Sequence, residues 1–248
     1  MRIRLMTYNM HRAIGVDRRF RLDRVARIID HHNPDVVLLQ EVDDGAPRSK
    51  GLHLGNELAK ELNYPHIAAG FNVALRKGRY GNATLSRYPI LRERNIDLTV
   101  DTRKRRGCQH TTIEAEKVAG HPHRLEVFNL HLGLSARERA RQIGTLVRSE
   151  EFAPLDAKQA CIVGGDFNDW RYLLHPVFRE ILDFGCGCER EDEPDETLRT
   201  YPSFSPQGGL DRIYHRGSIQ ATWAYTCKLP VSKVASDHLP LIADFELR

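Results

Sequence analysis

The sequence is poor in cysteine and has no long apolar run. Its five cysteines are odd in number and dispersed, which argues against a disulfide framework and favours the reduced cytoplasm. No stretch is long enough to cross a membrane, and the first residues lead directly into a predicted strand without a signal-peptide core. We therefore expect no stable membrane insertion. Cys186 and Cys188 could hold a soft metal, but the sequence lacks a second cysteine pair at zinc-like spacing.

The chain also lacks an internal linker and any strong charge imbalance. No segment rich in proline, glycine or serine divides it, so we expect one domain over residues 1–248. A hydrophobic content of 41% and a charged content of 28% exclude a largely disordered chain. The net charge of +4 permits an anionic substrate but does not by itself indicate nucleic-acid binding. The densest basic cluster, Arg103–Arg106, is either a solvated loop or a phosphate-binding segment.

A strand, a helix and a second strand are predicted near the start of the chain. Residues 3–9 alternate as a strand that ends at Asn9, and apolar residues then recur at helical spacing over 22–29. Asn33-Pro34 ends that helix, and a buried strand over 35–39 leads to Glu41. The order is strand, polar residue, helix, strand, acid.

The same order recurs in the second half. A strand over 125–129 leads to His131, and Ser135-Ala-Arg-Glu138 is a capping box that opens a helix. The next apolar run, over 160–163, ends at Asp166. Two facing sheets with helices outside would bring both sets of strand ends to one rim. Alternation over residues 239–247 predicts a further strand, half-buried at a sheet edge.

Polar residues follow most of these strands. In Gly164-Gly165-Asp166-Phe167-Asn168 the glycines allow a sharp turn, so that Asp166 and Asn168 project from the strand end, although an Asx turn would look the same. The other polar residues in such positions are Asn9, Glu41, His131, Asp211, Asp237 and His238.

These residue types suit phosphate chemistry with a divalent cation. Carboxylates from Glu41, Asp166 and Asp237, with amide oxygens from Asn9 and Asn168, are the oxygen ligands that Mg²⁺ prefers. Asp211 could orient the imidazole of His238 and keep it cationic, which would stabilise a phosphorane-like transition state. Taken singly, Glu41 also fits a surface acid and each histidine an incidental surface residue.

Taken together, the motifs resemble those of a known superfamily. Segments similar to the motif series of the endonuclease/exonuclease/phosphatase superfamily occur in order from residue 7 to residue 240: Thr7-Tyr8-Asn9, Leu39-Gln40-Glu41-Val42, Asn82-Ala83-Thr84-Leu85-Ser86-Arg87-Tyr88-Pro89, Asn129-Leu130-His131, Gly165-Asp166-Phe167-Asn168, Leu210-Asp211-Arg212-Ile213 and Ser236-Asp237-His238. The resemblance implies a four-layered α/β sandwich, in which two packed mixed β-sheets are flanked by helices. It also implies Mg²⁺ as the cofactor, with Mn²⁺ as a substitute.

The resemblance further implies a role for individual residues. Glu41 is the principal metal ligand, assisted by Asn9, and Asp237 lies beside the metal. Asp166 orients or deprotonates the attacking water, and Asn168 contacts the phosphate.

Three more roles follow from the same resemblance. Asp211 pairs with His238. His131 corresponds to the second histidine of the deoxyribonuclease and sphingomyelinase branches, a position at which AP endonucleases differ. This departure counts against repair of abasic sites.

We therefore expect hydrolysis of a phosphodiester by direct in-line attack of water, with a nuclease as the leading interpretation. The sequence pI of 8.8 and the basic cluster favour nucleic acid, and Trp170 would either stack on a base or pack in the core. The expected substrate contacts are Arg106, Tyr80, Asn82 and Trp170. The alternatives are a phospholipid or sphingomyelin phosphodiesterase, a phosphatase of soluble sugar or inositol phosphates, and a binding module without catalysis.

Overall fold

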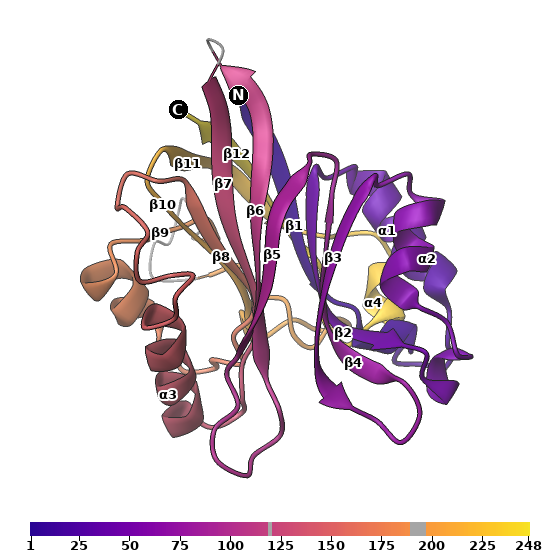
Figure 1. Cartoon of the computed structure of the whole chain (residues 1–248). Coiled ribbons are helices and arrows are strands. Elements are labelled where there is room, and N and C mark those ends of the chain that lie inside the picture. Colours follow the sequence, from indigo (N-terminus) through magenta and orange to yellow (C-terminus); the bar gives the residue numbers. More distant parts are fainter. Residues whose placement is uncertain (119–120, 189–196) are drawn as a thin grey trace.

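The computed structural model describes residues 1–118, 121–188 and 197–248, and two β-sheets stand face to face at its centre (Figure 1). The first sheet has the order β11-β12-β1-β2-β4-β3, from Ile219–Thr226, Leu241–Leu247, Arg2–Asn9, Val36–Asp44, Arg79–Ser86 and His66–Ala74. The second has the order β5-β6-β7-β8-β10-β9, from Ile90–Asp97, Gly107–Val118, His121–His131, Cys161–Asp166, Asp211–Arg216 and Gly185–Cys186. The second sheet is thus built from one continuous stretch of chain.

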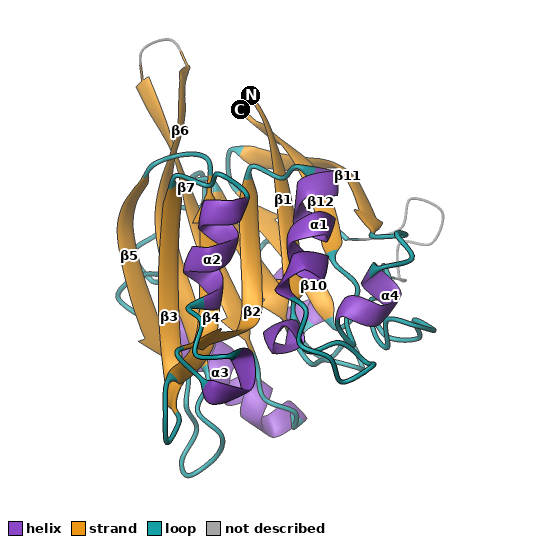
Figure 2. Cartoon of the chain, turned by 90° about the vertical axis from the view of Figure 1, so that its right-hand side faces the viewer, coloured by secondary structure: helices purple, strands orange, loops and turns teal. Residues whose placement is uncertain are grey.

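Helices cover the two outer faces, which gives the expected sandwich of four layers. Figure 2 shows α1 (Leu22–His32) and α2 (Leu54–Glu61) over the first sheet, with the short α4 (Ser232–Ala235) beside them. On the opposite side, α3 (Ala136–Val147) and a π-helical turn (Val177–Ile181) cover the second sheet (Figure 1). The remaining helical turns are His11–Ala13 and Pro47–Ser49. Within the described residues, no helix combines the length and apolar character needed to cross a membrane.

β2 in the first sheet is buried on both faces, which explains its unbroken apolar run. In β2, Val36 and Leu38 pack in the core between the sheets, whereas Val37 and Leu39 pack against the helix layer. A strand covered on both sides has no polar face, so alternation disappears from its sequence.

Both predicted strand-helix-strand units are confirmed. β1 pairs in parallel with β2 through α1, and β7 pairs in parallel with β8 through α3. The hydroxyl of Ser135 caps α3 by accepting a hydrogen bond of 3.2 Å from the backbone N–H of Glu138. Because the strands of each unit are parallel, their carboxyl ends meet at one end of the molecule, opposite the two chain termini (Figure 1).

The predicted edge position of the C-terminal strand is wrong. β12 lies between β11 and β1. Its polar residue Asp244 is 9% exposed and accepts from the guanidinium of Arg4 at 2.7 Å. The alternation therefore reflects an ion pair across neighbouring strands.

Amide side chains link the two sheets behind the carboxyl ends. Gln40 Nε2 donates to Asn129 Oδ1 at 2.8 Å, and Asn82 Nδ2 donates to the carbonyl oxygen of Asn129 at 3.0 Å. Thr84 Oγ1 donates to Gln109 Oε1 at 2.7 Å. These buried bonds fix the lateral position of one sheet on the other.

Candidate active site at the rim of the two sheets

Asp166 ends β8 in a turn that its neighbours make possible. Gly165 has a φ of 140°, and a Cβ there would collide with the carbonyl of Leu130 on β7, so only glycine fits. Asn168 follows with a φ of 50°, a conformation that asparagine tolerates. Its backbone N–H donates to Asp166 Oδ1 at 2.9 Å. The turn therefore holds the Asp166 carboxylate at the end of the sheet.

Three side chains from distant parts of the chain converge on the other oxygen of Asp166. Asn9 Nδ2 donates to Oδ2 at 3.0 Å. His131 Nε2 lies 3.4 Å from the same oxygen, and His238 Nε2 lies 3.7 Å from it. All four side chains are at least nine-tenths buried. Side chains from both sheets therefore surround one carboxylate oxygen.

His238 is held as a cation. Its Nδ1 lies 2.8 Å from Asp211 Oδ2, and the hydroxyl of Ser236 accepts from its backbone N–H at 3.2 Å. Burial lowers the pKa of His238, but the carboxylates of Asp211 and Asp166 outweigh it and raise the pKa to about 10. The proton on Nδ1 is therefore committed to Asp211, and Nε2 faces Asp166.

His131 has the opposite character. Burial, reinforced by the positive charges of Arg106 and Lys104, holds its pKa well below the ordinary value. Burial also raises the pKa of Asp166. Two imidazoles beside one carboxylate thus have pKa values displaced in opposite directions, an arrangement typical of acid–base sites.

Glu41 reaches the same rim through an irregularity in β2. The register between β2 and β4 shifts between Leu39 and Val42, and Glu41 itself has a φ of 58°. Such a bulge redirects a side chain at the end of a strand. Glu41 Oε2 is buried without a hydrogen bond among the described residues, and its closest basic neighbour is Arg12, whose Nε lies 3.5 Å away.

A left-handed turn after β1 completes this side of the rim. His11, Arg12 and Ala13 all have positive φ, between 44° and 61°. Consecutive left-handed residues cost about 1–2 kcal/mol each, so the fold imposes this turn. The backbone N–H of His11 donates to Asn9 Oδ1 at 3.1 Å. The imidazole Nδ1 of His11 lies 3.9 Å from Asp237 Oδ1.

The oxygen atoms around Glu41 suit a hard divalent cation. Glu41 Oε2 has no hydrogen-bond donor, and Asn9 and Asp237 flank the same turn. A buried carboxylate oxygen that accepts no hydrogen bond is typical of a metal ligand in the metal-free protein. Asp166, Asp211 and His238 also offer ligand atoms within 4.8 Å of one another, but their mutual hydrogen bonds and the cationic imidazole suit that group less well.

Two of the expected substrate-contact residues lie near the rim, and a third lies between the two sheets. Arg106 and Tyr80 are 7% and 5% exposed and lie beside Glu41 and His131. Asn82 is engaged in the contact between the sheets, so we assign it a structural position.

Trp170 is 52% exposed, which excludes the core-packing alternative for this residue. Its ring meets that of Tyr201 edge-on at 5.4 Å, and Tyr201 lies 4.9 Å from the ring of His238. An exposed indole therefore stands one aromatic ring away from the cationic histidine.

A buried ion network supports the loop that follows Asp166. Asp169 is fully buried and lies 3.0 Å from Arg139 Nη2 and 3.5 Å from Arg212 Nη1. Asp169 Oδ2 also accepts from the backbone N–H of Leu174 at 2.8 Å. The sequence does not indicate this network, nor the positions of His11 and Arg12 at the rim, although those two residues follow Asn9 directly. Ser236 belongs to the Ser236-Asp237-His238 motif, but the motif alone does not predict its hydrogen bonds.

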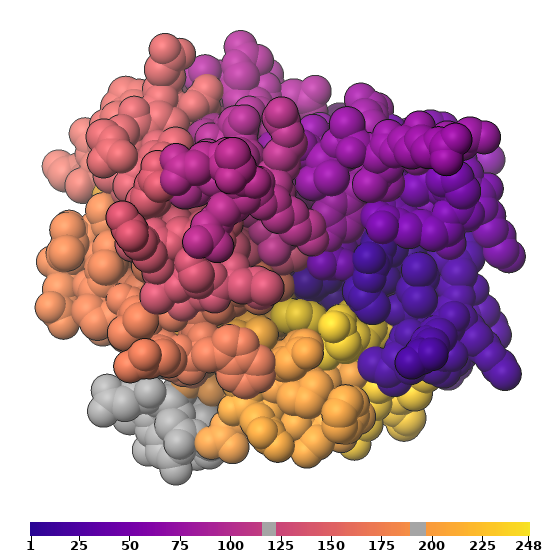
Figure 3. Space-filling model, turned by 90° about the horizontal axis from the view of Figure 1, so that it is seen from below, coloured from indigo at the N-terminus to yellow at the C-terminus, as the bar shows by residue number. Residues whose placement is uncertain are grey.

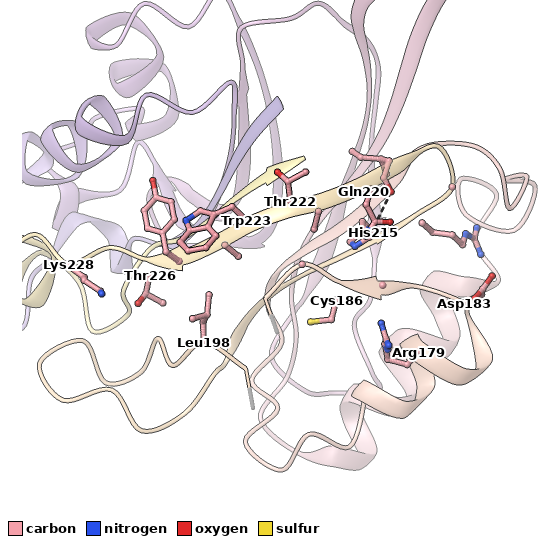
Figure 4. Close-up of a pocket in the computed structure, with 18 residues that line it drawn as sticks. Arg179, Asp183, Cys186, Leu198, His215, Gln220, Thr222, Trp223, Thr226 and Lys228 are labelled. Carbon is pink, nitrogen blue, oxygen red and sulfur yellow. Dashed lines mark hydrogen bonds between the residues drawn. The ribbon is translucent and has the colours of Figure 1, made fainter. Parts of the chain in front are cut away.

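Figure 3 looks onto this end of the molecule and shows N-terminal, central and C-terminal segments meeting around a hollow. A separate open groove of about 920 Å³ lies between β9, β10 and β11 (Figure 4). It is lined by residues such as Arg179, His215, Trp223 and Lys228, and by none of the converging side chains described above.

The chain is similar to known proteins over almost its whole length. The profile of the Endonuclease/Exonuclease/phosphatase family matches residues 6–238. YbhP of Escherichia coli strain K12, a protein described as uncharacterized, is 32% identical over 258 aligned positions, which cover 98% of this chain and 96% of YbhP.

Solved structures show the same fold. An endonuclease/exonuclease/phosphatase from Beutenbergia cavernae superposes with a TM-score of 0.79 at 20% identity, covering 99% of this chain and 72% of that one. A mannosyl-6-phosphatase of Bacteroides thetaiotaomicron superposes with a TM-score of 0.73 at 16% identity, covering 99% and 100%.

Proposed function

The chain belongs to the endonuclease/exonuclease/phosphatase family, whose members are hydrolytic phosphoesterases, and we propose that it cleaves a phosphodiester by direct attack of water with a divalent cation bound. The observation that carries this proposal is the convergence of Asn9, His131 and His238 on one oxygen of Asp166. A single buried carboxylate oxygen with this set of neighbours suits the alignment and deprotonation of a water molecule.

In this proposal Asp166 Oδ2 orients the water and receives its proton. The raised pKa of the buried carboxyl makes it a better proton acceptor than an ordinary aspartate. Asn9 holds the carboxylate in position through the 3.0 Å hydrogen bond to Oδ2. Water therefore attacks phosphorus from the side of Asp166.

The two histidines have different roles in this proposal. His238 carries its charge at Nε2 towards the site and stabilises the negative charge that grows on the phosphoryl oxygens. Neutral His131 donates or accepts a hydrogen bond without adding charge. Asn168 Nδ2 already donates to the carbonyl of Leu132 at 2.9 Å, so its second N–H is available for the phosphate.

Glu41, with Asn9 and Asp237, would hold Mg²⁺ or Mn²⁺, and the bound cation would supply positive charge that stabilises a phosphoester transition state. The fit rests on the oxygen ligands and on Glu41 Oε2, which makes no hydrogen bond among the described residues and has the Arg12 Nε as a basic neighbour at 3.5 Å. We also propose a cytoplasmic location, in keeping with the odd number and dispersed positions of the five cysteines.

A nuclease is our leading substrate assignment. Trp170 is exposed beside the aromatic ring of Tyr201, where it could stack on an unpaired base. A phosphatase of soluble sugar phosphates is the second candidate, favoured by the buried basic side chain of Arg106, which suits a small anion. The mannosyl-6-phosphatase neighbour supports only the fold, because its identity is low.

Turnover of defined substrates by the purified protein tests the proposal. Bis(p-nitrophenyl) phosphate, single-stranded and duplex DNA, RNA, phospholipid vesicles and sugar phosphates should be compared with Mg²⁺, with Mn²⁺ and with EDTA. We expect hydrolysis that EDTA abolishes. Failure to cleave every one of these substrates with either metal would refute the assignment as a phosphoesterase.

Glu41→Gln tests the metal site by a separate readout. The amide keeps the shape of the side chain but removes its charge, so Mg²⁺ affinity measured by calorimetry should fall together with activity. Glu57→Gln, which changes an exposed glutamate on α2, is the matched control and should leave both unchanged. Equal Mg²⁺ affinity in the two variants would remove Glu41 from the metal site.

A further inference from the structure

Arg106 is a buried cation that forms no ion pair among the described residues. Its side chain is 7% exposed, and its Nε is buried with no hydrogen bond among the described residues. The backbone is held in place, because its N–H meets Thr99 Oγ1 at 3.3 Å and its carbonyl accepts from Leu98 at 3.0 Å. A buried charge without a counter-charge is costly, so its retention points to an anion that arrives from outside the fold.

The other buried arginines show what a structural role looks like in this protein. Arg139 is 4% exposed and pairs with Asp169 at 3.0 Å. Arg212 is fully buried, donates to the carbonyl of Asp169 at 2.9 Å and lies over the ring of Tyr172. Both guanidinium groups pair with the carboxylate of Asp169, although Arg139 Nε, like Arg106 Nε, makes no hydrogen bond among the described residues. Arg106 has no such ion pair within the described part of the chain.

Further positive charge surrounds Arg106. Lys104 Nζ lies 5.4 Å from the centroid of the Tyr80 ring, and the charges of Arg106 and Arg12 both act on the Tyr80 hydroxyl. The hydroxyl of Tyr80 is itself buried without a hydrogen bond among the described residues. Arg48 belongs to the same group but is already neutralised by Asp43 at 2.6 Å.

The side chains of the basic cluster Arg103–Arg106 have different surroundings. Lys104 and Arg106 face Tyr80 and His131. Arg103 is 59% exposed and lies 3.9 Å from Glu138, and Arg105 is exposed. Arg106 is thus the buried member of the cluster, and Lys104 is exposed but lies over the Tyr80 ring.

The charge balance decides which anion fits. The phosphodiester to be cleaved carries one negative charge, and His238 and a metal on Glu41 already offset it. Arg12, Lys104 and Arg106 add three positive charges near the same rim, and Glu41 is the acid that acts on both Arg12 and Lys104. A substrate with a single phosphate would give these three positive charges no anionic partner.

We propose that Arg106, Lys104 and Arg12 form a subsite for a second phosphate of the substrate, next to the phosphate that is cleaved. The proposal rests on the function proposed above and narrows its substrate class to compounds with two phosphate groups. The buried Arg106 binds the phosphate oxygens by charge-assisted hydrogen bonds, and Lys104 and Arg12 supply further charge at its side. The second phosphate comes either from the backbone of a nucleic acid or from a soluble bisphosphate.

Binding of pyrophosphate in metal-free buffer tests the subsite without catalysis. Calorimetry should compare the wild type with Arg106→Gln, Lys104→Gln and the control Arg105→Gln, which removes an equal charge from the same segment. A charge-assisted hydrogen bond has a value of roughly 1.5–3 kcal/mol, so Arg106→Gln should weaken binding by about tenfold or more. Lys104→Gln should weaken it less, and Arg105→Gln hardly at all.

Thermal unfolding without ligand separates binding from folding. Removing an unpaired buried charge should leave the melting temperature of Arg106→Gln unchanged or higher, whereas Arg139→Gln should lower it. A marked loss of stability in Arg106→Gln would show that Arg106 has a structural partner, and would overturn the proposal.

A pair of substrates with the same cleavable bond extends the test to turnover with Mg²⁺. Thymidine 5′-(p-nitrophenyl phosphate) should be cleaved less efficiently than its 3′-phosphorylated form, and Arg106→Gln should remove the difference by raising KM. Arg105→Gln should keep it. Parallel assays of oligonucleotides of increasing length, and of fructose 1,6-bisphosphate against fructose 6-phosphate, identify which source supplies the second phosphate.

The two proposals fail in different ways. If pyrophosphate binds through Arg106 but no ester is hydrolysed with any metal, the phosphoesterase assignment fails and the subsite stands. If esters are hydrolysed but Arg106→Gln binds pyrophosphate as Arg105→Gln does, the subsite is refuted and the phosphoesterase assignment stands.

Discussion

His238 Nδ1 lies 2.8 Å from Asp211 Oδ2, although the two residues are separated by 27 positions in the chain. Both side chains are almost fully buried. This pair, with Asp166 on the other side of the imidazole, determines which ring nitrogen faces the rim and in which protonation state.

Asp211→Asn should therefore move the pKa of His238 down from about 10 towards its ordinary value of about 6.5 or below. Burial, which opposes the charge, would then be less strongly offset. The loss of activity at rising pH should begin at a lower pH than in the wild type, and a ¹H–¹⁵N NMR titration of His238 measures the change directly. An unaltered titration would show that Asp211 does not hold the charge.

Asp166→Asn should depress turnover by about two orders of magnitude or more, because a positioned acid–base group typically contributes that much. The fold should persist, since asparagine retains the oxygen that accepts from the N–H of Asn168. Steady-state kinetics measures the effect, and circular dichroism controls for folding. Turnover close to that of the wild type would place water activation on another residue.

Asp169→Asn should destabilise the protein by about 3–5 kcal/mol, because it leaves the buried guanidinium groups of Arg139 and Arg212 without their counter-charge. The matched control is Asp101→Asn. It breaks an exposed pair with Arg141 and should change the stability far less. Urea unfolding of the two variants makes the comparison, and similar losses in both would contradict it.

The stability of the protein should fall as the pH drops from about 6.5 to about 4 because of His32. Burial, aided by the charges of His31 and Arg4, lowers its pKa to about 4, while the unfolded chain protonates near 6.5. Between these values the unfolded state binds more protons, so acid favours unfolding. In His32→Gln the loss of stability between pH 7 and pH 5 should be smaller by about 1 kcal/mol, measured by urea unfolding.

The sequence was sufficient for the features that depend on neighbouring residues. The apolar run before Asp166 predicted the end of β8, and Ser135 predicted the start of α3. The predicted strand end before Glu41 is wrong, because β2 continues to Asp44 and Glu41 lies at a bulge within it. The two sheets and their covering helices followed from the repeated order of elements and from the resemblance of the motifs. These signals are local, so they can be read without the tertiary structure.

Features that depend on distances across the fold could not be predicted in the same way. The sequence shows four basic residues in a row at 103–106, but only packing shows that Arg106 is enclosed and Arg105 is not. Likewise, Asp244 in β12 has the spacing of a solvent-facing residue, and only its pairing with Arg4 explains it. The opposite pKa displacements of His131 and His238 also arise from neighbours on other strands.

The second sheet comes from a single uninterrupted part of the chain, and it carries His131, Asp166 and Asp211, whereas Asn9 and Glu41 belong to the first. Each half of the sandwich thus holds an incomplete set of reactive groups. Catalysis can begin only after the two sheets have packed together in register. The rate at which activity returns during refolding would therefore report the rate of that packing step. Secondary structure alone would give no such signal.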